Sequence, residues 1–162
     1  MLRKFEYVNR VKSTGFDMKE PDFKLPERST SKSAGYDFYC SERVEIPPYM
    51  IGDKPVLIPT GVKVYMPDDE FLMLVNRSSN PAKKFLVIPN SMGIIDADYV
   101  DNPDNEGEMM FAFYNVSDKP IIMEKGEKEC LCSKKSFIRC SGEWKRPYPT
   151  GAIIFSFFFS LP

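Results

Sequence analysis

Residues 56–76 read VLIPTGVKVYMPDDEFLMLVN and contain short apolar runs separated by Pro-Thr-Gly and by Pro-Asp-Asp. Runs of this length that are rich in β-branched and aromatic residues, and bounded by Pro, Gly, Asn and Asp, are typical of strands joined by tight turns. The stretch therefore predicts strands on both sides of Pro59-Thr60-Gly61, between Val56 and Met66, and a further strand over 71–75.

The same pattern continues on both sides of this stretch. Similar short runs occupy residues 44–46, 86–88, 94–100, 109–116 and 121–123. The 14 prolines among 162 residues leave little room for long helices, because a proline inside a helix costs about 3 kcal/mol. One short helix is predicted, with Asn80 as N-cap, Pro81 in its first position and Phe85 at its end. The sequence thus predicts an all-β sandwich, barrel or jelly roll with one short helix.

The composition excludes several classes of function. The chain contains no histidine, which rules out Ser-His-Asp and Cys-His hydrolases and histidine-based zinc enzymes. The 22 basic and 23 acidic residues leave a net charge of -1, so we expect no nucleic-acid polymer as partner. Residues 1–6 contain no apolar segment typical of a secretory signal, which predicts a cytoplasmic protein. The apolar residues 151–162 fall short of the roughly 20 that span a bilayer, so we expect no membrane partner.

The four cysteines allow two interpretations. Cys130, Cys132 and Cys140 have a spacing that suits half of a zinc site, to which Cys40 would add the fourth ligand. The alternative is a set of reduced thiols without a metal, and a cytosolic compartment favours it.

Three groups of polar residues are candidates for chemistry. Arg77-Ser78-Ser79 stands where a strand ends and a helix begins, and a guanidinium with hydroxyls at such a place suits phosphate binding. The alternative is a simple helix cap, which needs only Asn80. Asp37 lies two residues after Gly35, in a turn that leads into a strand.

The third group lies in residues 90–99, which read NSMGIIDADY. Ser91-Met92-Gly93 predicts a hairpin turn in which Gly93 supplies a positive φ or a close approach to a ligand. In a regular strand Asp96 and Asp98 share one face. Charged residues usually mark the solvent face of a strand, but in a chain without histidine these carboxylates are the best candidates for orienting a water molecule.

Together these groups resemble the motifs of the trimeric dUTP pyrophosphatase (dUTPase) family. Residues 33–38, SAGYDF, resemble the first motif, Arg77-Ser78-Ser79 the second and residues 90–99 the third. Ile58-Pro59-Thr60-Gly61-Val62 is also typical of the family, and residues 102–107, NPDNEG, resemble a subgroup from Gram-positive bacteria and their phages. The resemblance covers roughly residues 5 to 128. It implies a dUTPase-like jelly roll, or distorted β-barrel, that forms a homotrimer with active sites at the subunit interfaces.

The resemblance also implies a reaction and a role for each motif residue. dUTP and water would give dUMP and pyrophosphate, with Mg²⁺ held mainly by the substrate phosphates and no direct protein ligand. Asp96 would be the catalytic residue that positions the attacking water, and Tyr99 would pack on the deoxyribose. Ser78 would donate to the oxygen that bridges the α- and β-phosphates, and Arg77 would pair with Asp37. The substrate-binding residues would be Arg77, Ser78, Ser79, Asn90, Gly93, Ile95 and Tyr99, with Asp37 and Asp98 in support.

The resemblance fails after residue 128. Gly126-Glu127-Lys128 begins the family's fourth motif, but Glu129 and Leu131 stand where that motif usually has an apolar residue and a glutamine. Residues 129–162 contain nothing that resembles the fifth motif, a Gly-rich arm that covers the nucleotide. We therefore expect a β domain over 1–128 and an atypical tail over 129–162, for which a frameshift near codon 129 is our hypothesis.

Without the arm, weak dUTP binding and slow or absent turnover are expected. Two alternatives stay open on sequence alone. One is a jelly roll that binds nucleotides or proteins without catalysis, and the other is the related dCTP deaminase.

Overall fold

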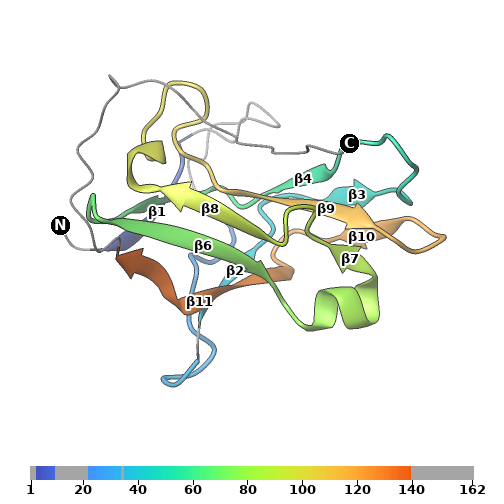
Figure 1. The fold of residues 1–162 in the computed structure, drawn as a ribbon, viewed down its shortest axis with the longest axis horizontal. Helices are drawn as coiled ribbons and strands as arrows, with labels where there is room; N and C mark the ends of the chain where they lie inside the picture. Colours follow the sequence, from blue (N-terminus) through green and yellow to red (C-terminus); the bar gives the residue numbers. More distant parts are fainter. Residues whose placement is uncertain (1–2, 10–21, 34, 140–162) are drawn as a thin grey trace, which may run out of the picture.

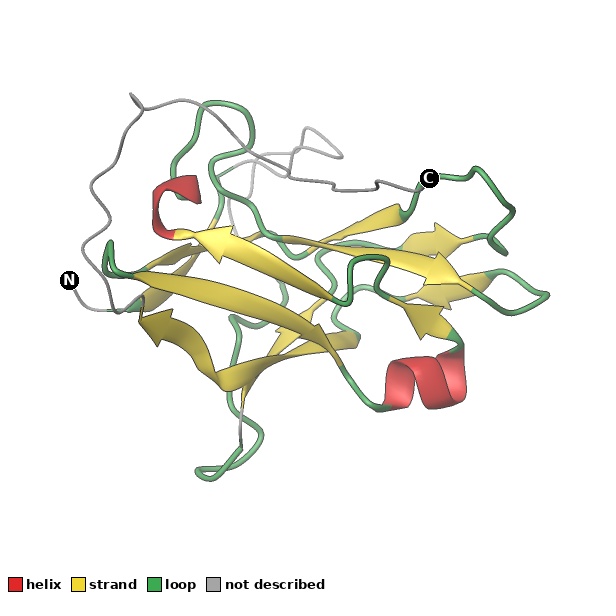
Figure 2. Cartoon of the chain, in the orientation of Figure 1, coloured by secondary structure: helices red, strands yellow, loops and turns green. Residues whose placement is uncertain are grey.

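The computed structural model describes residues 3–9, 22–33 and 35–139, which form short strands and two helical turns (Figures 1 and 2). The strands are β1 (Lys4–Tyr7), β2 (Gly35–Tyr39), β3 (Val44–Ile46), β4 (Val56–Pro59), β5 (Val62–Tyr65), β6 (Glu70–Asn76), β7 (Leu86–Val87), β8 (Met92–Asp96), β9 (Met110–Asn115), β10 (Ile121–Met123) and β11 (Lys128–Arg139). The helical turns are η1 (Asn80–Lys84) and η2 (Ala97–Tyr99). The predicted all-β class is confirmed.

The strands form sheets with the orders β1-β5, β10-β3, β2-β11-β6-β8 and β4-β9-β7. The strands predicted around Pro59-Thr60-Gly61 are confirmed as β4 and β5, and β6 confirms the prediction over 71–75. Gly61 has a φ of 63°, which explains the glycine at this turn because other residues rarely adopt that conformation.

The core follows from the period-2 pattern of the longer strands. Along β6 the side chains of Leu72 and Leu74 are buried, and along β9 those of Phe111 and Phe113 are buried. Their neighbours in sequence are more exposed, as the alternating faces of a strand require. Burying a side chain of this size contributes about 1.5–3 kcal/mol, so β6 and β9, which belong to different sheets, together stabilise the core.

The short helix is confirmed, but its cap differs from the prediction. Ser79 is the N-cap, Asn80 and Pro81 are the first two helical residues, and the turn has the wider hydrogen-bond pattern of a π-helix. The side chain of Asn80 is buried, so it is not at the solvent-facing cap position. Phe85 ends the helix in the left-handed region with a φ of 55°.

The hairpin before β8 is also displaced from its predicted position. The turn comprises Pro89, Asn90 and Ser91, and the positive φ of 64° belongs to Ser91 rather than to Gly93. Gly93 lies inside β8, where a Cβ atom would approach the Leu74 Cβ to 3.3 Å. The glycine therefore serves close packing between β6 and β8. The predicted strand over 94–100 is wrong beyond Asp96, because η2 begins at Ala97, so Asp96 and Asp98 do not share a strand face.

A strand also runs through the segment whose sequence lacks strand alternation. β11 begins at Lys128, crosses the expected boundary at residue 128 and inserts between β2 and β6. Its register shifts between Lys128 and Cys130 and again between Cys132 and Phe137. Residues 140–162, with Cys140 and the apolar end, lie outside the described residues.

Within 3–9, 22–33 and 35–139, no group of three or more Asp, Glu, Cys or His side chains is arranged to hold a metal ion. The proposed zinc set includes Cys140 and so lies partly outside the described residues. Neither helical turn in the described part of the chain has the length and apolar character needed to cross a bilayer.

Candidate functional site

The two main polar motifs lie at opposite ends of the β6-β8 strand pair (Figure 1). Asp96 pairs with Phe71 at the start of β6, whereas Arg77 follows the last residue of that strand. Six residues of extended chain, at about 3.3 Å each, place Asp96 and Arg77 roughly 20 Å apart within one subunit. After the roles that the resemblance implies, we call the region of Arg77, Ser78, Ser79 and Asp37 the phosphate end, and that of Asp96, Asp98 and Tyr99 the water end.

At the phosphate end, Arg77, Ser78 and Ser79 form the connection between β6 and η1. The Asn80 amide donates to the Arg77 carbonyl at 3.0 Å, and Asn76 Nδ2 donates to the Leu86 carbonyl at 2.9 Å. These two bonds fix the connection to the neighbouring strand. Ser78 is exposed, and no side-chain hydrogen bond from Ser79 caps the helix. Both hydroxyls are thus placed to donate to a ligand.

Asp37 is fully buried beside the phosphate end. Its Oδ2 accepts hydrogen bonds from Ser29 Oγ at 2.5 Å and from Lys128 Nζ at 2.9 Å. Burial by itself raises the pKa of Asp37, but these two bonds and the positive charge of Arg77 outweigh it, so the pKa lies below its ordinary value. The predicted Arg77–Asp37 pair is corrected here: Lys128 is the ion-pair partner, and Arg77 acts on Asp37 through its charge.

Asp37→Asn is expected to lower the free energy of unfolding at about pH 7 by about 1–3 kcal/mol, because a buried charge-assisted contact is lost. The ordinary pKa of this carboxyl is 3.8, and the folded state lowers it. The stabilisation is therefore present above that pH and disappears as the pH falls through the lower, folded-state pKa. Urea unfolding of both proteins at about pH 7 and about pH 2 measures this, and an equal difference at both values would contradict the assignment.

At the water end, Asp96 is the last residue of β8 and its side chain is exposed in the single chain. Although Asp96 is exposed overall, the surrounding chain removes part of the water around its carboxyl, and this effect, followed by the negative charge of Asp98, raises the pKa of Asp96 above its ordinary value. A carboxylate with a raised pKa is a better proton acceptor for water than an ordinary aspartate. The single turn of η2 sets the spacing between Asp96 and Tyr99.

Asp98→Asn is expected to lower the pKa of Asp96, because it removes the neighbouring negative charge. Activity that requires ionised Asp96 decreases as the pH falls through this pKa, so the acidic limb of the pH profile of kcat/KM should move to lower pH. The exposed Asp118 provides a matched control, since Asp118→Asn leaves the water end intact. An acidic limb that stays in place in Asp98→Asn would show that Asp98 has no such role.

β8 also provides backbone groups that can bind a ligand. It is the outermost strand in the described order β2-β11-β6-β8, so alternate N–H and C=O groups point away from β6. These groups lie between Asn90, in the preceding turn, and Asp96. The predicted residues Gly93 and Ile95 both belong to this strand. The third motif therefore lies along one continuous strand edge, from the turn at Asn90 to Asp96.

Three side chains that matter at the site were not predicted: Ser29 and Lys128, which contact Asp37, and Asn105, which contacts Tyr99. Lys128 is 91 residues from Asp37 along the chain, and only the insertion of β11 beside β2 brings the two together. Lys128 follows the recognisable Gly126-Glu127 pair, which is the one sequence signal that pointed to it.

Comparisons with known proteins show which family this chain is similar to. The dUTPase family model matches residues 21–131. A deoxyuridine 5'-triphosphate nucleotidohydrolase from Lactococcus lactis is 46% identical over 127 residues, which cover 78% of this chain and 77% of that protein. The crystal structure of a dUTPase from Streptococcus mutans has a TM-score of 0.68 and 39% identity, covering 83% of this chain and 94% of that chain.

A dUTPase mutant from phage phi11 of S. aureus, whose structure reports coordination of a structural Mg(II) ion, has a TM-score of 0.63 and covers 96% of this chain and 99% of that chain. At 20% identity this likeness concerns the fold alone. The predicted dUTPase-like jelly roll is confirmed by these neighbours. Since the family model spans more than half of the sequence and contains all three polar motifs, the chain belongs to the dUTPase family.

Proposed function

We propose that this chain hydrolyses dUTP to dUMP and pyrophosphate. The observation that carries the proposal is that the segment matched by the family model, residues 21–131, contains both the phosphate end and the water end. Relatives with the matching segment are named deoxyuridine 5'-triphosphate nucleotidohydrolases.

The proposed site lies between subunits of a homotrimer. Attack on the α-phosphorus requires the water, the phosphorus and the leaving oxygen to lie in line within a few ångströms. Asp96 and Ser78 of one subunit are too far apart for this, because they stand at opposite ends of β6 and β8. We therefore assign Asp96 and Tyr99 to one subunit, and Arg77, Ser78 and Ser79 to its neighbour.

In this mechanism Asp96 holds the attacking water and accepts its proton as the bond to the α-phosphorus forms. Ser78 donates a hydrogen bond to the α-β bridging oxygen, where negative charge develops as pyrophosphate leaves. Arg77 and Ser79 hold the phosphate oxygens. The phosphate end offers one carboxylate, Asp37, which is buried and already paired with Lys128, so a Mg²⁺ ion there would be held mainly by the phosphates. When bound, the ion neutralises phosphate charge.

The water end and β8 account for substrate selection. Backbone groups of β8 with the Asn90 side chain read the uracil edge, and the Tyr99 ring leaves no space for a 2′-hydroxyl. Buried polar groups that must pair with the base discriminate by about 10⁴-fold or more, whereas an extra methyl is rejected by about 10- to 200-fold.

The proposal is tested with purified protein, Mg²⁺ and a panel of dUTP, UTP and dCTP. Pyrophosphate release from dUTP in preference to the other two supports it. Ammonia release from dCTP would instead identify a deaminase, and nucleotide binding without pyrophosphate release would identify a non-catalytic binding protein.

We expect the atypical tail, residues 129–162, to make dUTP turnover slow. Residues 129–162 do not resemble the covering arm, so water exclusion over the nucleotide is incomplete. We expect kcat/KM to be well below that of the Lactococcus lactis relative measured alongside, and equal values would contradict this. A frameshift near codon 129 predicts an arm-like Gly-Phe-Gly segment in another reading frame of the gene.

We also propose a cytoplasmic location, since the buried Cys40 thiol, which donates to the Glu42 carbonyl, suits a reducing compartment.

A further inference from the structure

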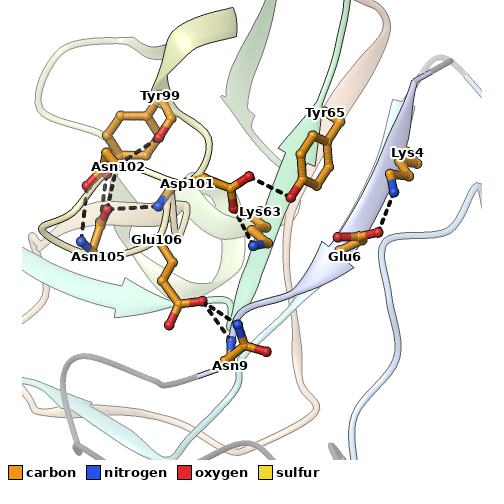
Figure 3. A network of polar contacts seen from close by, with 11 residues as sticks. Lys4, Glu6, Asn9, Lys63, Tyr65, Tyr99, Asp101, Asn102, Asn105 and Glu106 are labelled. Atoms are coloured by element: carbon orange, nitrogen blue, oxygen red, sulfur yellow. Dashed lines mark hydrogen bonds and ion pairs between the residues drawn. The ribbon is translucent and has the colours of Figure 1, made fainter. Parts of the chain in front are cut away.

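Tyr99 is followed by a loop, residues 100–108, that folds back on it (Figure 3). Asn102 Nδ2 donates to the Tyr99 carbonyl oxygen at 2.7 Å, and Asn105 Nδ2 donates to the Tyr99 hydroxyl at 2.8 Å. That hydroxyl in turn donates to the Glu108 carbonyl at 3.3 Å. The loop therefore holds Tyr99 both at its main chain and at the tip of its ring.

The Asn105 side chain connects these contacts through four hydrogen bonds. Besides the Tyr99 hydroxyl, its Nδ2 donates to the Glu108 carbonyl at 3.2 Å. Its Oδ1 accepts from Asn102 Nδ2 at 2.8 Å and from the Gly107 amide at 3.1 Å. Two donated and two accepted bonds use the full capacity of a side-chain amide. An aspartate in this position would lose both donated bonds.

The loop is also attached to β5 and to Asn9, which follows β1 (Figure 3). The Asp101 carboxylate accepts from Lys63 Nζ at 2.5 Å and from the Tyr65 hydroxyl at 2.7 Å, both on β5. Glu106 Oε2 accepts from the backbone amide of Asn9 at 3.0 Å and from its side chain at 3.1 Å.

Close packing between the loop and Tyr99 further limits movement. Gly107 has a φ of 80°, and a Cβ atom on it would lie 2.7 Å from the Tyr99 carbonyl oxygen. The backbone of the loop thus packs directly against Tyr99. With the anchors to β5 and Asn9, this leaves the loop little freedom to move away from the ring.

We propose that Asn105 is a positioning residue that fixes the Tyr99 ring against the sugar and thereby sets the preference for deoxyribose over ribose. The inference rests on the proposed function, in which this ring excludes the 2′-hydroxyl. Excluding a single oxygen atom requires a ring that cannot retreat, because a small displacement makes room for it. The bonds from Asn105 and to Glu108 hold the tip of the ring, so losing them admits ribose.

The test compares affinities for the non-hydrolysable α,β-imido analogues of dUTP and UTP in the wild type and in Asn105→Ala. The preference for the deoxynucleotide is expected to fall about 5- to 30-fold. Asn115→Ala is the matched control, since Asn115, the last residue of β9, likewise donates from Nδ2 to two carbonyls, those of Ile46 and Lys119. The control is expected to lose stability and keep the preference.

Tyr99→Phe provides an independent second variant, because it removes the hydroxyl and keeps the ring. It is expected to lose preference as Asn105→Ala does, and the double variant to lose little more. An equal loss of affinity for both analogues in Asn105→Ala, or an unchanged preference in Tyr99→Phe, would overturn the inference. If Asn105→Ala fails to fold, Tyr99→Phe decides. A wild type that binds neither analogue would contradict the proposed function as well.

Discussion

Asp96→Asn is expected to reduce dUTP turnover by about 10²- to 10⁴-fold, the range usually lost with a positioned proton acceptor. An asparagine has nearly the same shape and fills the same space at the end of β8, but it cannot accept the proton of the attacking water. Nucleotide affinity should therefore change little. Steady-state pyrophosphate release gives kcat, and titration with the α,β-imido analogue of dUTP gives the affinity.

The matched control is Asp118→Asn, in which the same substitution is made at an exposed aspartate in the turn before β10. It should keep wild-type turnover. An Asp96→Asn protein that retains more than about a tenth of the wild-type kcat would remove Asp96 from the catalytic role.

Ser78→Ala is expected to lower kcat by about 10²- to 10³-fold, with a smaller change in KM. The reason is that charge on the α-β bridging oxygen develops as pyrophosphate leaves, so a donor to this oxygen stabilises the transition state more than the bound substrate. Ser78 is exposed where β6 leads into η1, so the substitution should leave the free energy of unfolding almost unchanged.

Ser117→Ala is the control for this variant, because the Ser117 hydroxyl donates to the nearby Asn115 and Lys119, outside the proposed site. A Ser78→Ala protein in which KM rises and kcat stays the same would show that Ser78 binds substrate and transition state equally. That result would contradict the role assigned to it.

Much of the fold follows from local sequence patterns. The strands β6 and β9 are short, almost continuous apolar runs, and β6 ends at the turn residue Asn76; the alternation lies in the burial of their side chains. β11 was not predicted, because it lies between β2 and β6 with two register shifts, and a strand with such shifts does not keep one alternating pattern. The N-cap of η1 is Ser79, one residue before the predicted Asn80, whose side chain is buried.

For the candidate site, too, the sequence predicts some features and not others. The residues of each motif are neighbours in sequence, so their grouping could be predicted from the residue types. The hydrogen-bond partners of Asp37 are Ser29 and the distant Lys128, and no local sequence pattern indicates these contacts. The separation of Arg77 from Asp96 is likewise a property of the fold, because the antiparallel pairing of β6 with β8 places the two motifs at opposite ends.

The central claim is that one catalytic site takes Asp96 from one subunit and Ser78 from another. Mixing inactive Asp96→Asn and Ser78→Ala subunits in equal amounts, after dissociation and reassembly, tests it most directly. In random trimers about a quarter of the sites would combine an intact Asp96 with an intact Ser78, so dUTP turnover should recover towards about a quarter of the wild-type rate. If the mixture releases pyrophosphate no faster than the average of the two variants alone, the shared site is contradicted.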